Sequence, residues 1–179
     1  MSKILGISGS LRKGSYNTAL LQAARDVAPD VIGIGSIRGI PLYDGDLESD
    51  GVPAAVQDLK DQVAAADGLL LVTPEYNNSM PGVLKNAIDW LSRPSGDIRN
   101  VFRGKAVAVI GATPGGWGTL LGQNAWLPVL HALGAEHWSG GRLLVPGAGR
   151  VFDENGRLID DSVSERLDRF IRNFIDYIA

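Results

Sequence analysis

The stretch GLLLVTPEYNNSMPGVLKNAIDW, residues 68–90, contains an apolar run, a polar loop and an amphipathic helix in that order. The apolar run at 68–72 predicts a strand that is buried on both faces, as in a parallel sheet. The loop that follows it is rich in amides and carries a tyrosine and a glutamate, and a helix is predicted over 81–92. Because open α/β sheets bind ligands beyond the carboxyl ends of their strands, this loop is the first candidate site.

The same alternation of strand and helix continues on both sides of this stretch. Further strands are predicted at 3–8, 31–37, 105–112 and 142–146, and further helices at 15–28, from Pro53 onward, at 120–133 and at 162–178. Five strands that alternate with helices favour one parallel sheet with helices on both faces. The flavodoxin-like strand order 2-1-3-4-5, in a three-layer α/β sandwich, fits better than a six-stranded dinucleotide fold.

One domain is expected to span residues 1–179, since the chain contains no linker, repeat or low-complexity tract. Residues 39–51 and 152–158 are predicted as loops. Ser162 and Glu165 stand in capping-box spacing at the start of the last helix.

Composition excludes several classes of function. The net charge of -3 gives no reason to expect nucleic acid or an anionic membrane as a partner. The absence of cysteine excludes disulfides, thiol catalysis and cysteine-bound metals. His131 and His137 have no carboxylate at ligand spacing, so no metal site is predicted. Neither a signal peptide nor an apolar span of bilayer length is found, and a cytoplasmic protein is expected.

The loop after the first strand reads SGSLRKGSYN, residues 8–17, and leads into a helix. Backbone N–H groups at a helix N-terminus attract anions. The side chains of Ser10, Ser15 and Asn17 add hydrogen-bonding groups, and Arg12 adds a charged donor suited to a phosphate. The alternative is an ordinary serine-capped helix with a solvated arginine.

Two well-known phosphate loops do not match this segment. Gly9 and Gly14 have the spacing of a P-loop, but Ser15 stands where the lysine of that motif belongs. The dinucleotide fingerprint GxGxxG is also absent after the first strand. The sequence therefore argues against a nucleotide triphosphatase and against a nicotinamide dinucleotide held in the manner of a Rossmann fold.

The loop after the fourth strand reads GATPGGWGT, residues 111–119. Gly115 and Gly116 permit a positive φ and a close approach of the backbone to a ligand, and Trp117 is placed to cover the edge of that ligand. The alternative is a glycine turn with a tryptophan packed in the core. Together, the three loops offer an anion cradle, a platform for a planar ring and a glycine wall. A phosphate joined to a flat heterocycle, as in FMN, satisfies all three.

On these motifs the sequence resembles the NADPH-dependent FMN reductases, a family that includes quinone, azo-dye and chromate reductases. SLRKGSYN is similar to the phosphate motif of that family, and PEYNNSMPGVLKNAIDW is similar to its flavin-ring motif. The resemblance implies that the phosphate is held by Ser10, Arg12, Ser15 and Asn17, with Tyr16 nearby. It places Pro74, Glu75, Tyr76, Asn77 and Ser79 against the isoalloxazine, and Thr113, Gly115 and Gly116 along its far edge. Thr113 replaces the serine that is commoner in the family.

The resemblance also implies a reaction. Hydride passes from NADPH or NADH through bound FMN to a quinone, azo compound, free flavin or metal oxyanion in a ping-pong sequence. No side chain is nominated as a catalytic acid or base, because the cofactor carries the chemistry, and Glu75 is interpreted as an organiser of its loop.

A homodimer or homotetramer is implied as well, with Met80, Trp90 and Trp126 as candidates for either the interface or the core. Two other functional classes stay open at this point: a flavodoxin-type FMN electron carrier and a flavin-free α/β interaction protein.

Overall fold

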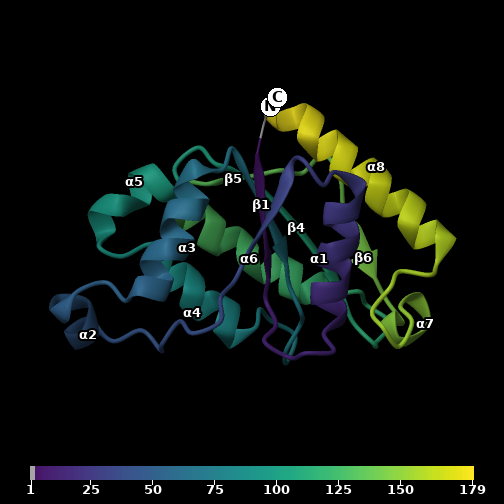
Figure 1. Ribbon diagram of the computed structural model, residues 1–179, viewed down its shortest axis with the longest axis horizontal. Coiled ribbons are helices and arrows are strands. Elements are labelled where there is room, and N and C mark those ends of the chain that lie inside the picture. The colour runs from purple at the N-terminus through teal and green to yellow at the C-terminus, as the bar shows by residue number, and fades with distance from the viewer. Residues whose placement is uncertain (1–2) are drawn as a thin grey trace.

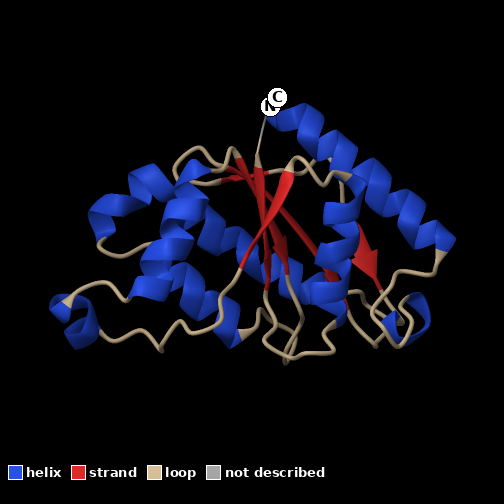
Figure 2. Ribbon diagram, viewed as in Figure 1, coloured by secondary structure: helices blue, strands red, loops and turns tan. Residues whose placement is uncertain are grey.

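The predicted parallel sheet is present in the computed structural model, which describes residues 3–179 (Figures 1 and 2). Four strands pair in the order β2-β1-β3-β4, with bounds β1 (Ile4–Ser8), β2 (Ile32–Gly35), β3 (Gly68–Val72) and β4 (Ala106–Ala112). Each pairing is parallel. The flavodoxin-like order 2-1-3-4-5 is therefore confirmed.

The fifth position of the sheet is shared by two short strands. β5 (Glu136–His137) pairs with the start of β4, and β6 (Leu143–Val145) pairs with its end. The single strand predicted at 142–146 is only the second of these. After β5 the N–H of Trp138 still donates to the carbonyl of Val107 at 2.9 Å, and its buried ring packs 5.0 Å from the ring of Phe170 on α8 (Asp161–Ile178). Residues 139–142 then separate β5 from β6.

Helices cover both faces of the sheet, as predicted. One face carries α1 (Tyr16–Val27), α7 (Ala148–Val151) and α8 (Asp161–Ile178), and the other carries α3 (Ala54–Ala65), α4 (Gly82–Leu91), α5 (Ile98–Val101) and α6 (Leu120–Leu133) (Figure 1). Each face has its own apolar core, built from alternate residues of the same strands. Among residues 3–179, no helix combines the length and the apolar character needed to cross a bilayer.

Three local predictions differ from the structure. A short helix, α2 (Gly45–Asp50), lies within the loop predicted at 39–51, and the 3-10 helix η1 (Ser95–Asp97) precedes α5. Pro53 occupies the N-cap position of α3 rather than its first turn. The N-cap of α8 is Asp160 instead of Ser162, because the Asp160 Oδ1 atom accepts a hydrogen bond of 2.9 Å from the N–H of Val163.

The segment before α2 is fastened to α4. The carbonyl oxygen of Pro41 accepts hydrogen bonds from Asn86 Nδ2 at 2.8 Å and from Trp90 Nε1 at 2.9 Å. The carboxylate of Glu48 on α2 accepts the hydroxyl of Tyr43 at 2.7 Å and Arg93 Nε at 3.0 Å. These two hydrogen bonds, Tyr43 first, lower the pKa of Glu48 below its ordinary value. Residues 41–50, which we call the strap, are thus held against α4, the helix that follows the loop at 73–81.

Candidate functional site

The loops that follow β1, β3 and β4 meet at one edge of the sheet, because parallel strands all end at the same edge (Figure 2). The N–H of Gly9 donates to the carbonyl of Val72 at 2.9 Å, and the N–H of Thr73 donates to that of Ile110 at 2.8 Å. A Cβ atom on Gly9 would lie 2.9 Å from Pro74 Cδ, so the first loop touches the second directly. We call these segments loop 1 (residues 9–15), loop 3 (73–81) and loop 4 (113–119).

Loop 1 offers hydroxyl donors at the start of α1. Ser15 is the N-cap, and its Oγ accepts the N–H groups of Asn17 at 3.2 Å and Thr18 at 3.3 Å. Ser10 Oγ accepts the N–H of Arg12 at 3.3 Å. Because both hydroxyls act here as acceptors, each keeps its own hydrogen for a ligand. Together with the positive end of the α1 dipole, they suit an anion.

The guanidinium of Arg12 stands over the ring of Tyr16, 5.6 Å from the ring centroid. Tyr16 in turn stacks on Phe152, with ring centroids 5.9 Å apart. Within the described part of the chain, Arg12 forms no ion pair with a carboxylate. Its N–H groups are thus available to a phosphate, and Tyr16 positions the arginine through the cation–π contact.

Asn17 has a role that sequence reasoning missed. Its side-chain amide is buried and forms two hydrogen bonds with the backbone of Ala112, at the end of β4: Nδ2 donates to the carbonyl oxygen, and Oδ1 accepts the N–H, each at 2.9 Å. The amide therefore joins α1 to the strand that leads into loop 4. The backbone N–H of Asn17 donates to Ser15 Oγ, and Oδ1 accepts the N–H of Ala112. The phosphate contact predicted above would therefore have to come from the second hydrogen of Nδ2.

Loop 3 contains a two-residue turn of defined shape. Tyr76 and Ser79 exchange two backbone hydrogen bonds of 3.0 Å, while Asn77 and Asn78 adopt φ values of 50° and 60°. Positive φ at both central residues is typical of a type I′ turn, in which asparagine is among the favoured residues. The side chain of Tyr76 is 50% exposed at the rim. The turn presents this ring without needing a ligand to shape it.

Glu75 organises loop 3, as the sequence analysis favours. Its Oε2 atom accepts the N–H of Gly122, in the first turn of α6, at 2.8 Å. The side chain of Thr119, at the N-cap of α6, forms no capping hydrogen bond with the backbone of the helix, so Glu75 supplies the missing cap from another segment. A carboxylate at a helix N-terminus is also favoured by the helix dipole. This contact gives Glu75 a positioning role, and the expectation that it donates no proton stays a prediction.

Behind loop 3 lies a buried polar contact that sequence reasoning did not identify. The hydroxyl of Thr73 donates to the carbonyl of Pro74 at 2.9 Å and accepts Trp126 Nε1 at 3.1 Å. Trp90 and Trp126 are both fully buried, and Met80 is partly buried against the core. The core role left open for the two tryptophans is therefore the correct one, and neither is available to an interface.

Loop 4 is open toward the rim and tied down on its other side. The N–H of Gly115 donates to Thr113 Oγ1 at 3.4 Å, and the N–H of Ala148 donates to the carbonyl of Thr113 at 3.0 Å. A Cβ atom on Gly116 would have no heavy atom within 4 Å. Gly115 and Gly116 permit a positive φ but do not adopt one; in loop 4 it occurs at Gly118 and Thr119, where the chain turns past β6 into α6.

The donors present fit FMN. Loop 1 combines an arginine, two hydroxyl hydrogens and a helix N-terminus, as a phosphate monoester requires. Loop 3 presents a half-exposed tyrosine on a rigid turn, and a Cβ atom on Gly82, at the start of α4, or on Gly116, in loop 4, would have no heavy atom within 4 Å. Trp117 in loop 4 is 71% exposed and is therefore not packed in the core.

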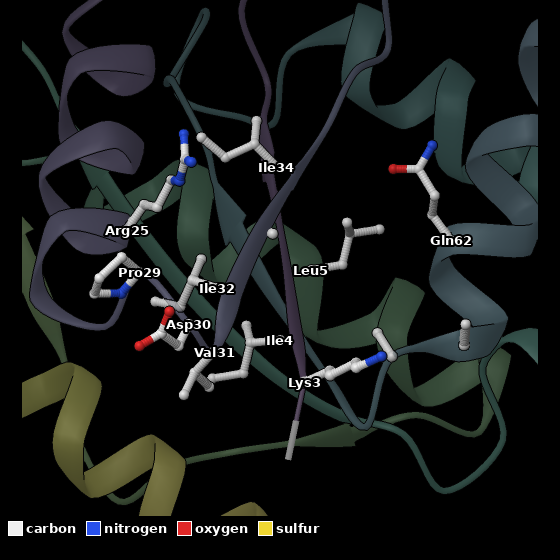
Figure 3. Close-up of a pocket in the computed structure, with 13 residues that line it drawn as sticks. Lys3, Ile4, Leu5, Arg25, Pro29, Asp30, Val31, Ile32, Ile34 and Gln62 are labelled. Carbon is white, nitrogen blue, oxygen red and sulfur yellow. The ribbon is translucent and has the colours of Figure 1, made fainter. Parts of the chain in front are cut away.

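Two cavities adjoin the site, and a third lies elsewhere. Two adjoin loop 1: one of about 230 Å³ faces the end of β2, and one of about 580 Å³ lies between α1 and residues 153–157. The third, of about 620 Å³, lies where β1 and β2 begin and is lined by residues such as Arg25, Val31 and Ile34 (Figure 3). That cavity is at the opposite end of the sheet from the three loops, so its size alone is no argument for function.

Comparison with known proteins points to one family. Residues 2–149 match the family described as NADPH-dependent FMN reductase. A Pseudomonas aeruginosa NAD(P)H-dependent FMN reductase is 46% identical over 167 residues, which is 92% of this chain and 89% of that protein. A Burkholderia 2-hydroxy-1,4-benzoquinone reductase is 40% identical over 99% of this chain and 94% of its own length.

Among solved structures, the flavoenzyme NAD(P)H:(acceptor) oxidoreductase FerB from Paracoccus denitrificans superposes with a TM-score of 0.88 at 34% identity. The match covers 99% of this chain and 97% of that one. The likeness therefore extends over all three loops of the rim as well as over the sheet.

Proposed function

Because the chain belongs to the family of NADPH-dependent FMN reductases, we propose that it is an FMN-dependent NAD(P)H oxidoreductase that reduces small quinone-like acceptors. The observation that carries this proposal is the meeting of an anion cradle, a rigid tyrosine turn and an open glycine loop at one edge of the sheet. The curated relatives are described as reductases of flavin or quinone, which supports an enzyme over a passive electron carrier.

Bound FMN supplies the chemistry of accepting hydride and delivering electrons. The protein holds and orients it. Arg12, Ser10 and Ser15 bind the phosphate, and Tyr76 and Ser79 support the ring from loop 3. No side chain of the rim is required as an acid or base, and the carboxylate of Glu75 is already occupied by the N–H of Gly122.

Backbone donors beside the ring assist by stabilising negative charge on its pyrimidine side. The N–H of Tyr76 is engaged with the carbonyl of Ser79 and does not contribute. Within residues 3–179, the N–H of Asn77 has no protein acceptor, and the turn holds it at the rim. We therefore assign this role to Asn77.

We propose a ping-pong order, in which NAD(P)H and the acceptor use the same open site in turn. The open space at Gly82 and Gly116 supports this proposal. A quinone is the acceptor best supported, since it is a planar molecule and the Burkholderia relative is described as a benzoquinone reductase. Azo compounds, free flavin and metal oxyanions are further acceptors to test.

The decisive experiment is to purify the protein, record its absorption spectrum with FMN and add NADPH under anaerobic conditions. Bleaching of the flavin band, followed by its return when a small benzoquinone is added, is expected. A flavoprotein that is bleached only by dithionite would act as an electron carrier instead. Colourless protein that does not bind added FMN would refute both readings.

We further propose that the protein forms homodimers or homotetramers. The exposed apolar side chains Val83 on α4 and Leu121 and Leu127 on α6 lie on helices of the same face, and each is about two-fifths exposed: 40%, 41% and 41%. Light scattering after size exclusion measures the mass, and a monomer at micromolar concentration would contradict this proposal. The cytoplasmic location stays a prediction.

A further inference from the structure

A small cationic cavity lies beside loop 1, on the side that faces the end of β2. It has a volume of about 230 Å³ and is lined by Ser10, Arg12 and Lys13 from loop 1 and by Ser36, Ile37 and Arg38 after β2. Three cationic side chains border it, and among the described residues no carboxylate does. Since surface arginines and lysines are usually interspersed with acidic groups, a cavity of one sign indicates an anionic ligand.

Arg38 is held in place at this cavity. Its Nη2 atom donates to the carbonyl oxygen of Leu11 in loop 1 at 2.8 Å, and its backbone N–H donates to Ser36 Oγ at 3.2 Å. Because Ser36 Oγ acts as an acceptor here, its hydroxyl hydrogen can be donated to a ligand. The other guanidinium donors of Arg38 have no carboxylate partner among residues 3–179. A fixed arginine and a hydroxyl donor form a suitable pair for one phosphate.

The charge here exceeds what the phosphate of FMN requires. That phosphate carries about 1.5 to 2 negative charges, and Arg12 with the N-terminus of α1 offsets about 1.5 of them. Lys13 and Arg38 remain, and both are exposed. Both border the cavity, and neither forms an ion pair with a carboxylate among residues 3–179, so they are left for a second anionic group. The volume suits a phosphate and part of a ribose but is too small for a whole nucleotide.

We propose that this cavity binds the 2′-phosphate of NADPH, with Arg38 and Ser36 as direct ligands and Lys13 as a second cation. The proposal rests on the reductase function proposed above and deepens it, because the 2′-phosphate is the only group that distinguishes NADPH from NADH. Arg38 is therefore the residue that makes the protein prefer NADPH. The adenosine end of NADPH then lies along loop 1 and the end of β2, and its nicotinamide end reaches the open rim between loops 3 and 4.

The test compares three variants of the FMN-loaded protein. Arg38→Gln removes the charge but retains an amide donor for the carbonyl of Leu11. Lys13→Gln removes a charge from the same cavity and leaves that hydrogen bond intact. Arg25→Gln removes a charge from the exposed part of α1 at the opposite end of the sheet (Figure 3), and is the matched control.

Calorimetric titration with 2′-AMP, 5′-AMP and inorganic phosphate gives a readout that does not depend on turnover. We expect 2′-AMP to bind at least about tenfold more tightly than 5′-AMP or phosphate. Arg38→Gln should weaken 2′-AMP binding about 10- to 150-fold, as for the loss of a charged hydrogen bond. Lys13→Gln should have a smaller effect, and Arg25→Gln none. Equal affinity for inorganic phosphate, or no effect of Arg38→Gln, would overturn the proposal.

Steady-state kinetics with a small quinone provides the second arm. In Arg38→Gln the KM for NADPH should rise about tenfold or more, with kcat, the KM for NADH and the affinity for FMN unchanged. An equal rise for NADPH and NADH would contradict the assignment. Weakened FMN binding with an unchanged NADPH/NADH ratio would make Arg38 a ligand of FMN instead. If the protein does not bind FMN, the reductase function fails, yet the 2′-AMP titration of the same protein still decides whether the phosphate site exists.

Discussion

Replacing Asn17 with alanine should destabilise the whole protein, although the residue belongs to a phosphate-binding motif. Parallel strands direct the N–H and C=O of alternate residues to the same side. On β4, the carbonyl of Ile110 still pairs with Thr73, but Ala112, two residues further, lies beyond the end of β3. The amide of Asn17 takes the place of the missing strand there.

The size of the effect follows from the two groups left without partners. Asn17 is 5% exposed, and Ala112 is 3% exposed, so water has little access to either. A buried polar group that loses its hydrogen bond costs about 1–3 kcal/mol. For two such groups, with some relaxation, the free energy of unfolding should fall by about 2–4 kcal/mol. In a chain of this length that corresponds to a decrease in Tm of about 4–16 °C.

The assay is urea unfolding of the FMN-free protein followed by far-UV circular dichroism, so that changes in cofactor affinity do not enter. Asn17→Asp is the matched variant: it keeps an acceptor for the N–H of Ala112 but sets an oxygen against its carbonyl, and it should also destabilise the protein. Asn124→Ala removes an exposed amide, which accepts Arg142 Nη2 at 2.7 Å, and should change stability by less than about 0.5 kcal/mol. If Asn17→Ala also stays within about 0.5 kcal/mol of the parent, the reasoning is wrong.

Three further perturbations test other parts of the site. Arg12→Ala should raise the Kd for FMN about 10- to 150-fold, measured by quenching of flavin fluorescence, and unchanged affinity would remove Arg12 from the phosphate site. Glu75→Gln should lower the free energy of unfolding by about 0.3–1 kcal/mol, because it removes a charge at the start of α6. The variant should retain its turnover per bound FMN. Loss of turnover with full FMN occupancy would indicate a proton-transfer role. The lowered pKa of Glu48 contributes stability that is present above its ordinary value of 4.5 and is lost as the pH falls through the lowered value. Thermal unfolding of Glu48→Gln should therefore depend less on pH below 4.5 than that of the parent, and parallel profiles would show that the strap has no electrostatic part.

The elements that could be predicted share strong local signals. The strands at 68–72 and 106–112 are continuous apolar runs. Helix α6 begins and ends at the predicted residues, and Gly134 stops it. The division of the fifth strand into β5 and β6 could not be predicted from the sequence, because it depends on tertiary contacts such as that of Trp138 with Phe170. Likewise, Asp160 and Ser162 are both suitable caps by residue type, and only the exact start of α8 decides between them.

Within the site, residue types indicated the chemistry, and contacts between distant segments assigned the roles. Serines, an arginine and a tyrosine in loops that follow buried strands predicted a phosphate and a planar ring, because hydrogen-bonding capacity and strand alternation are local properties of the chain. The pairing of Asn17 with Ala112, of Glu75 with Gly122 and of Arg38 with Leu11 joins residues 95, 47 and 27 positions apart. Such pairs form only when the sheet brings the ends of its strands together, so the tertiary structure alone determined which polar groups hold the rim in place and which are left to bind a ligand.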